Sequence, residues 1–402
     1  MKRKLIFILC LSLWVFDACL AQIEIEEKPI QEVYAPGAKP KAIKPKKIKV
    51  GLFLPFFKEG TDTNSLKHAF ALSSLDYLAG VKVAIDSLEK TNSVSVDLYV
   101  EDTELDSSIV EGLLNRYQYR DLDVLIGPIF KSGVEMAIPI IQKRKTKMYL
   151  PFEKDFSSKR LNNVISSQKN SIAFANFFAF YFSKEYSTQG KKIVLIHSSK
   201  DGKAGKESRE IDSLIKINLA GAIDTSGVML LDIAAKENSN FANRLKKSKS
   251  YVFFINTKNN YYANNALGQI AKLIDSSPEV YCMEAILESE IPLFELWDSL
   301  HVKFLSRFFV NYEEERTGQL RKKIMESYNE DPAEFTYKGY NDIMFLLNAF
   351  SSGEDWLTES MNKEYVNEVS GFYFSQDPSS LGVFNGYHSV WRYDHLKLFR
   401  QY

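Results

Sequence analysis

The feature that most constrains the fold of this 402-residue chain is an alternation of short apolar segments with longer amphipathic ones. Ile48–Phe56 (IKVGLFLPF) is an almost continuous apolar run, as expected for a strand buried on both faces of a parallel sheet. Ala69–Leu88 follows it with apolar residues spaced three and four apart, which predicts a helix. Repeated strand–helix units of this kind predict a doubly wound parallel sheet.

The alternation occurs twice, which predicts two lobes of the same α/β type. A chain of this length is long enough for two or three domains of roughly 100–200 residues each. Further strands are expected at Val94–Val100, Val124–Ile126 and Met148–Leu150 in the first round, and at Lys192–His197, Val228–Ile233, Tyr251–Ile255 and Val280–Met283 in the second. The C-terminal part predicts helices at Gly318–Ser327, Ala333–Phe350 and Met361–Val366, and strands at Val302–Val310, Gly371–Ser375, Tyr387–Tyr393 and Leu396–Phe399.

The N-terminus has the three parts of a signal peptide for export. These are a basic start at Met1–Lys4, a mostly apolar run at Leu5–Phe16, and small residues at Cys19 and Ala21 ahead of Gln22. The apolar run is too short for a membrane-spanning helix, which needs ~20 residues. We therefore predict that residues 1–21 are a signal peptide and that the mature chain is periplasmic.

Cys19 offers a second interpretation of this end of the chain, as the lipidated residue of a lipoprotein signal, although Phe16 and Asp17 fit that signal poorly. Residues 22–47 contain a stretch rich in Pro and Lys (APGAKPKAIKPKK) with almost no apolar side chains, which predicts an extended, solvated linker. No later apolar stretch is long enough to span a bilayer, so no transmembrane segment is predicted in the mature chain.

Charge and cysteine content exclude several classes of protein. Lys plus Arg and Asp plus Glu both number 51, so no basic excess points to nucleic acid or to an anionic membrane surface. Loss of residues 1–21 removes Cys10 and Cys19 and leaves Cys282, so no intrachain disulfide is possible. The stability of the fold must therefore come from its hydrophobic cores.

No set of residues predicts catalysis, a metal or a cofactor. The five histidines show neither the four-residue spacing of a helical zinc site nor a neighbouring Cys, and the G-x-S-x-G motif is absent. Residues 202–207 (GKAGKE) have too few residues between their glycines for a phosphate loop. The acids within residues 101–106 lack the glycine and the final glutamate of a calcium loop. We therefore predict that the chain is not an enzyme.

Seven segments, taken in order along the chain, form a recognisable pattern. They are Ala79–Asp86 (AGVKVAID), Val94–Asp102 (VSVDLYVED), Leu125–Pro128 with Lys131–Gly133, Met148–Phe152 (MYLPF), Tyr328–Pro332, Tyr337–Ala349 (YKGYNDIMFLLNA) and Gly371–Phe374. Together they resemble the type 1 periplasmic-binding family, and in particular its branched-chain amino-acid-binding proteins. The resemblance covers nearly all of residues 48–402 and depends on the order and spacing of the motifs.

The resemblance implies two doubly wound parallel-sheet lobes joined by three crossing strands, with a ligand held in the cleft at the carboxyl ends of the strands. This agrees with the strand–helix alternation and with the general position of ligands in open α/β sheets. By this likeness the crossings lie near Ile165–Ser171, Phe304–Tyr312 and Val366–Phe374. Lobe one then comprises residues 48–166 and 312–367, and lobe two comprises residues 167–311 and 368–402.

The same resemblance implies a set of ligand-binding residues. Ser132 matches the small hydroxyl residue that follows the family's third strand, and Glu284 matches the acid that binds the ammonium group of the ligand. Phe152 and Glu153 depart from the Gly-Ala-Thr-like stretch that the amino-acid binders have after strand four. The implied set is Lys131, Ser132, Phe152, Glu153, Ser198, Ser199 and Glu284. For Lys131, Glu153 and Glu284 the alternative is a solvated charge at the rim of the cleft.

Two functions of different classes follow from these observations. The first is an exported solute-binding protein that closes its lobes on a small polar ligand, such as an amino acid or a peptide, and delivers it to an inner-membrane permease of an ABC transporter or to a sensor. The second is an envelope scaffold or a regulator of cell-wall synthesis that uses the same fold. A polar cleft that brings Lys131, Ser132 and Glu284 together favours the first, and a cleft lined by Phe130 and Phe152 favours the second.

Overall fold

The computed structural model describes residues 46–57, 65–91, 94–152, 161, 163–167, 170–186, 189–220, 227–245, 250–287, 292–352, 360–366 and 369–401. The predicted signal peptide, the linker up to residue 45, and Glu153 lie outside the described residues. Among the described residues, no helix is both long and apolar enough to cross a membrane.

The first lobe is built on an eight-stranded sheet in the order β2-β1-β3-β4-β5-β13-β12-β11. Its strands are β1 (Lys46–Leu54), β2 (Val94–Asp102), β3 (Val124–Ile126), β4 (Lys147–Leu150), β5 (Val164–Ser166), β11 (Glu364–Val366), β12 (Gly371–Gln376) and β13 (Val383–Asn385). Neighbours from β2 to β13 pair in parallel, and β12 and β11 extend the sheet as antiparallel strands.

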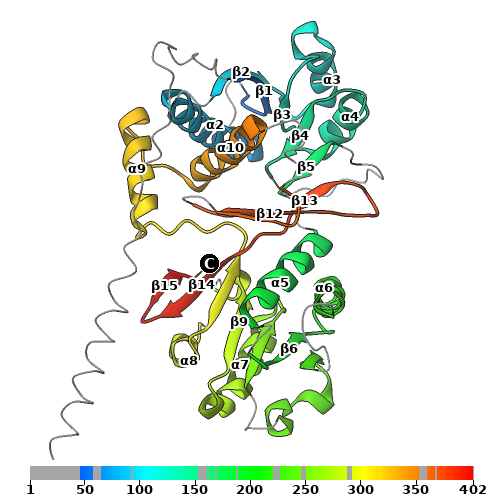
Figure 1. The fold of residues 1–402 in the computed structure, drawn as a ribbon, viewed down its shortest axis with the longest axis vertical. Coiled ribbons are helices and arrows are strands. Elements are labelled where there is room, and N and C mark those ends of the chain that lie inside the picture. The colour runs from blue at the N-terminus through cyan, green and yellow to red at the C-terminus, as the bar shows by residue number, and fades with distance from the viewer. Residues whose placement is uncertain are drawn as a thin grey trace, which may run out of the picture. The chain divides into compact units, whose positions relative to one another are not determined.

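Helices cover both faces of this sheet (Figure 1). They are α2 (Leu66–Lys90), α3 (Ser107–Asn115), α4 (Lys131–Ile141), α9 (Glu315–Tyr328) and α10 (Glu334–Ser352). Alternate residues of β1 face opposite ways: Leu52 and Leu54 pack into the core formed with α2 and α10, whereas Phe53 packs into the core formed with α3 and α4. Burial on both faces is the reason why this strand is an almost unbroken apolar run.

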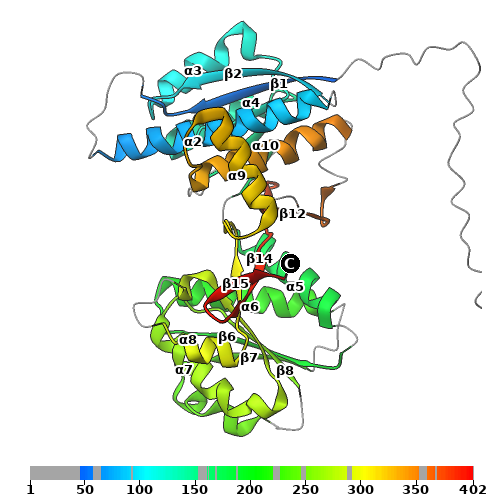
Figure 2. The same cartoon turned by 90° about the vertical axis from the view of Figure 1, so that its left-hand side faces the viewer.

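The second lobe repeats the plan with a seven-stranded sheet in the order β7-β6-β8-β9-β10-β14-β15. Its strands are β6 (Lys192–His197), β7 (Val228–Asp232), β8 (Tyr251–Ile255), β9 (Glu279–Met283), β10 (Lys303–Ser306), β14 (Ser389–Asp394) and β15 (Lys397–Arg400). One face packs on α5 (Ser171–Tyr186) and α6 (Lys203–Leu219), and the other on α7 (Asn260–Ile270) and α8 (Phe294–Ser299), as Figure 2 shows. Short 3-10 helices are η1 (Tyr117–Tyr119), η3 (Lys236–Asn238), η4 (Phe241–Arg244), η5 (Ala271–Ser276) and η6 (Glu284–Ile286).

The chain passes between the two sheets three times, at residues 167–170, 307–314 and 386–388. The predicted fold of two parallel-sheet lobes joined by three crossings is therefore confirmed. The first two crossings lie where they were predicted, and the third does not: Val366–Phe374 contributes to β11 and β12, which both belong to the first sheet. The predicted lobe boundary at 367/368 is wrong for the same reason, because the strands on both sides of it pair with each other in the first sheet. The stretch Met361–Val366, predicted as a helix, ends in strand β11.

The third crossing falls at a glycine for a steric reason. The Gly386 amide donates to the Tyr373 carbonyl oxygen at 2.8 Å, which ties the end of β13 to β12. A Cβ on Gly386 would lie 2.0 Å from the carbonyl oxygen of Ala173 in α5, far inside van der Waals contact. The chain can therefore leave the first sheet here and pass close to α5 only because no side chain is present.

Candidate functional site

Two neighbouring cavities lie where the three crossings meet. The first, of about 230 Å³, is called the α10 cavity because that helix supplies five of its lining residues (Glu334, Phe335, Lys338, Asn341 and Asp342). The second, of about 340 Å³, is called the α6 cavity and is lined by Ser208, Ile211, Asn256, Lys258 and Met283 among others. Glu284, Arg307 and Asn385 line both cavities, so we treat the two as one cleft.

The crossing segments supply much of the lining. Ser167 and Asn170 come from the first crossing, Arg307 and Phe308 from the second, and Tyr387 and His388 from the third. Asn385, just before the third crossing, accepts hydrogen bonds on its side-chain oxygen from the backbone amides of Tyr373 (2.9 Å) and Tyr387 (3.1 Å). The cleft therefore lies beside the segments that join the two lobes.

The first-lobe wall of the cleft contains a buried charge pair on α10. Lys338 Nζ lies 3.1 Å from the Asp342 carboxylate, one helical turn away, and the Tyr77 hydroxyl of α2 donates to the same carboxylate at 3.0 Å. Asp342 is 1% exposed. Burial raises the pKa of Asp342, although the charge of Lys338 acts in the opposite direction. Burial also raises the pKa of Glu334, which lies one turn before Lys338.

The second-lobe wall is held by a hydrogen-bonded network at the ends of β6 and β8. His197 Nδ1 lies 3.1 Å from one oxygen of Asp212, and Asn256 Nδ2 donates to the other at 2.9 Å. Asn256 also donates to the Ser208 carbonyl oxygen at 3.1 Å. Burial raises the pKa of Asp212, and the contacts with His197 and Asn256 lower it by a smaller amount. The network fixes Asn256 and Ser208 at the switch point of the sheet, where strand order reverses and ligands of such sheets bind.

Two of the predicted site residues lie in the cleft. Glu284 directly follows β9 and lines both cavities. Phe152 lines the α10 cavity, and its ring centroid lies 5.5 Å from that of Tyr77 and 5.2 Å from that of Phe335. The Phe152 ring is therefore part of the first-lobe core as well as of the cleft wall.

The other described members of the predicted set lie elsewhere. Lys131 and Ser132 are exposed on the first turn of α4 and line neither cavity. Ser198 is buried, and its hydroxyl accepts a hydrogen bond from the Lys200 amide at 3.3 Å within the turn after β6. Ser199 is exposed, and its amide donates to Asp232 at 3.0 Å.

The residues that sequence reasoning missed are the ones on the crossings and on α10. Arg307 and Asn385 lie in segments whose place in the cleft depends on the fold of both lobes. Lys338 and Asp342 carried a usable signal, because they are charges four residues apart within the apolar stretch YKGYNDIMFLLNA. Charges on the buried face of a helix are expected to pair with each other or with a ligand.

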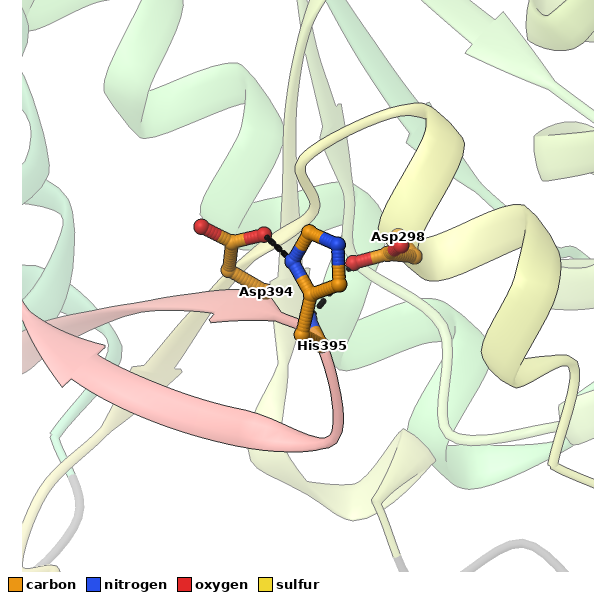
Figure 3. Close-up of side chains that lie close together, drawn as sticks. All are labelled: Asp298, Asp394 and His395. Atoms are coloured by element: carbon orange, nitrogen blue, oxygen red, sulfur yellow. Dashed lines mark hydrogen bonds and ion pairs between the residues drawn. The ribbon is translucent and has the colours of Figure 1, made fainter.

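Two further polar clusters lie outside the cleft. Asp298, Asp394 and His395 place carboxylate oxygens and an imidazole nitrogen within 4.8 Å of one another (Figure 3). His395 Nδ1 lies 2.6 Å from Asp394, and the His395 amide donates to Asp298 at 2.7 Å. His395 and Leu396 both have a positive φ, so these contacts stabilise the tight turn between β14 and β15.

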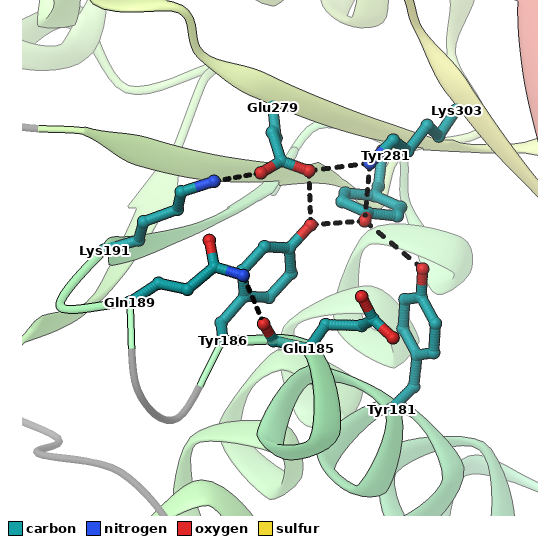
Figure 4. Close-up of polar contacts among 8 residues, drawn as sticks. All are labelled: Tyr181, Glu185, Tyr186, Gln189, Lys191, Glu279, Tyr281 and Lys303. Carbon is teal, nitrogen blue, oxygen red and sulfur yellow. Dashed lines mark hydrogen bonds and ion pairs between the residues drawn. The ribbon is translucent and has the colours of Figure 1, made fainter. Parts of the chain in front are cut away.

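The other cluster lies at the amino ends of β9 and β10, whereas the cleft lies at their carboxyl ends. Glu279 receives hydrogen bonds from Lys191, Lys303 and Tyr186, and the Tyr186 hydroxyl lies 2.5 Å from that of Tyr281 (Figure 4). Burial disfavours ionisation of Glu279, but these hydrogen bonds outweigh it and lower its pKa to about 2. This cluster ties α5 to the second sheet.

Comparison with solved structures identifies the fold. The C-domain of LpoA from Haemophilus influenzae, described as a regulator of PBP1A, superposes with a TM-score of 0.54 at 12% identity, covering 88% of this chain and 100% of that one. Full-length LpoA gives 0.56 at 12% identity, with 89% of this chain matching 59% of that one. A protein from Rhodospirillum rubrum, assigned as a branched-chain amino acid ABC transporter, gives 0.54 at 11% identity and covers 89% of this chain and 99% of that one.

The fold is that of the type 1 periplasmic-binding proteins. No protein-family model and no curated protein sequence matches the chain. At this level of identity the matching structures establish the fold and leave the function to be argued from the cleft.

Proposed function

We propose that this protein is a non-catalytic receptor that binds a small polar ligand, carrying both a carboxylate and an ammonium group, in the cleft at the three crossings. The observation that supports this most is the lining of the cleft. Both lobes and all three crossings contribute to it. Besides the Lys338–Asp342 pair and Lys258, it places the Arg307 guanidinium and the carboxylates of Glu284 and Glu334 around cavities of about 230 and 340 Å³. The larger cavity is at the lower end of the range of roughly 300–1,000 Å³ for small-molecule sites and the smaller one is just below it, which suits a ligand of the size of an amino acid or a short peptide.

In this proposal Arg307 binds the ligand carboxylate. A guanidinium has five N–H donors in a fixed planar arrangement, so Arg307 can keep a protein partner and still donate to a ligand. Glu284 and Glu334 bind the ammonium group from opposite lobes. Lys338 is not assigned to the ligand carboxylate, because the Asp342 carboxylate lies 3.1 Å from its Nζ and already neutralises its charge. Phe152 supplies an apolar wall, and Glu284 and Phe152 are the two members of the sequence-predicted set that the proposal keeps.

The cellular setting is part of the proposal. Residues 1–21 direct export to the periplasm, the predicted linker ahead of β1 tethers the folded part, and the lobes bend at the crossings when the ligand binds. The partner that receives the ligand-bound state is an inner-membrane permease or another envelope protein. Hinge closure on a ligand is the conformational change that two-lobe binding proteins use.

Thermal unfolding of the purified protein with a panel of amino acids, short peptides and muropeptides tests this function. A ligand at about 100 times its dissociation constant stabilises the folded state by ~2.7 kcal/mol. In domains of this size that shifts the midpoint by roughly 5–10 °C. We expect Arg307→Ala and Glu284→Gln to abolish the shift, and Arg209→Ala, an exposed residue of α6 outside both cavities, to leave it intact.

A second candidate function, regulation of cell-wall synthesis through a protein partner, is favoured by a different observation. The LpoA C-domain matches over its whole length, and Phe152 closes part of the cleft by packing on Tyr77 and Phe335. If no compound in the panel shifts the midpoint, the receptor proposal is wrong and this second function becomes the better one.

A further inference from the structure

A second groove, distinct from the cleft, lies on the first lobe between α9 and α10. Its volume is about 660 Å³, and β11 and β12 form its floor. We call it the α9–α10 groove; Figure 2 shows the two helices, in yellow and orange, on the same side of the sheet. Phe372 is the residue that its lining shares with the cleft.

The floor of the groove is a packed aromatic surface. The ring of Phe345 stacks on that of Phe372 with centroids 4.4 Å apart and lies 5.6 Å from that of Tyr365. Phe345 and Phe372 are buried, whereas Tyr365 and Val366 on β11 are 37% and 51% exposed. Tyr365 shares the face of Phe372, its partner in the strand pairing, whereas Val366 is the next residue of the strand and its side chain faces the other way. The exposed Tyr365 ring on a rigid base offers apolar surface that a partner can bury at little entropic cost.

The α9 wall of the groove is basic. Arg316, Gln319, Leu320 and Lys323 have the spacing of one helix face, and they are the residues of α9 that line it. Among the described residues, the lining contains no carboxylate. Lys323 donates to the Ser87 hydroxyl, and Arg316 forms no hydrogen bond or ion pair within the part of the chain that the structure describes. A positive wall beside an apolar floor attracts negative charge more strongly than an open surface does.

The third property of the groove is an open sheet edge. β11 is the last strand of the eight-stranded sheet, and among the described strands it pairs only with β12. Within the described part of the chain, the backbone N–H and C=O groups on its other edge have no strand partner and can pair with another strand. The edge is three residues long: the Glu364 carboxylate pairs with Lys184 at 3.6 Å, and the exposed side chains of Tyr365 and Val366 carry no charge that would protect the edge.

We propose that the α9–α10 groove docks an extended acidic segment of a partner protein. The segment adds to β11 as a strand, covers the exposed ring of Tyr365, and places a carboxylate against the Arg316 guanidinium. Strand addition supplies affinity through the backbone, and alternate side chains supply specificity. This inference is independent of what the cleft binds, because Arg316 and β11 take no part in the cleft.

Fluorescence anisotropy with labelled seven-residue peptides tests the proposal on the purified protein. One peptide alternates Val and Glu, and the other alternates Val and Lys. We expect the acidic peptide to bind at least about tenfold more tightly than the basic one, and Arg316→Glu to weaken its binding by about tenfold or more. Lys322→Glu is the matched control, because Lys322 lies on the same helix with its side chain 80% exposed and does not line the groove.

Two N-methylated forms of the acidic peptide separate strand addition from simple charge attraction. The N–H groups of alternate residues point to the same edge of a strand, so methylation of all Val amides blocks one edge of the peptide and methylation of all Glu amides blocks the other. We expect one form to lose binding and the other to retain it. Equal binding of both forms, equal effects of Arg316→Glu and Lys322→Glu, or binding of neither parent peptide would each overturn the proposal. Complete competition by N-acetylglutamate would identify a site for small anions and would also overturn it.

Discussion

At the scale of single residues, the pairing of Lys338 with Asp342 places a charged group in the protein interior. Asp342 is almost fully buried and its pKa is raised by burial, so its charge is tolerated only because the ammonium of Lys338 and the hydroxyl of Tyr77 contact it. Removal of one partner of such a pair leaves an uncompensated charge, which costs more than the pair itself contributes.

We expect Lys338→Met to destabilise the protein by about 3 kcal/mol, the lower end of the range for a broken buried pair because the Lys338 side chain is 15% exposed. Urea denaturation monitored by circular dichroism measures this. Lys322→Met, at a position 80% exposed, should change the midpoint little. Asp342→Asn in the Lys338→Met background should recover part of the loss. Equal midpoints for the two single variants would contradict this account of the pair.

Glu279 leads to a prediction for acid stability. Its pKa in the folded protein is lowered to about 2, from an ordinary 4.5. A lowered pKa means that the ionised group stabilises the folded state above pH 4.5, and that this contribution is lost as the pH falls from about 4.5 to about 2. After allowance for partial solvent exposure we estimate it at about 1–2 kcal/mol.

In Glu279→Gln the side chain cannot ionise, so the loss of stability between pH 4.5 and pH 2 should shrink by that amount. Denaturation at several pH values measures this difference. Glu326→Gln, on an exposed face of α9, is the control and should keep the pH dependence of the unsubstituted protein. If Glu279→Gln loses as much stability on acidification as the control, the hydrogen bonds around Glu279 are not what lowers its pKa.

At the scale of elements, the close crossing of α2 and α10 sets the geometry of the first lobe. A Cβ on Gly80 would lie 1.9 Å from the Thr336 carbonyl oxygen, and a Cβ on Gly339 would lie 2.1 Å from the Tyr77 carbonyl oxygen. Each helix therefore packs backbone to backbone against the glycine of the other. This contact also brings Tyr77 within hydrogen-bonding distance of Asp342.

We expect Gly339→Ala to destabilise the protein by about 1–3 kcal/mol, because the helices must separate to accept the methyl group. Gly318→Ala is the matched control: it is also a glycine within a helix, but no atom lies within 4 Å of its added Cβ. That variant should be neutral or more stable by up to about 1 kcal/mol, since alanine favours helix formation. Thermal unfolding compares the two, and a stable Gly339→Ala variant would rule out the tight crossing.

At the scale of the whole molecule, each lobe is assembled from separate parts of the chain. The first sheet takes strands from residues 46–166 and again from 364–385, and its core needs α10 from residues 334–352. A fragment of residues 46–167 would expose the face of α2 that packs on α10. We expect this fragment to show no cooperative thermal transition by circular dichroism, in contrast to the full chain. A fragment that unfolds cooperatively at a similar midpoint would mean that the lobe folds without its C-terminal part.

The sequence by itself determined the class of the fold. Apolar runs such as Ile48–Phe56 are strands buried on two faces, and period-2 burial along β1 follows from backbone geometry alone. Local pattern was sufficient for these features because their cause is local.

Only the tertiary structure decided the third crossing and the content of the cleft. Residues 361–366 have a pattern compatible with a helix, but pairing with β12 makes β11 a strand, and a pairing between distant segments leaves no local signal. Arg307 and Asn385 meet Glu284 because three crossings converge, whereas Lys131 and Ser132 follow a strand and still lie outside both cavities. Which side chains share a cleft depends on how two lobes are joined, and that follows from long-range packing.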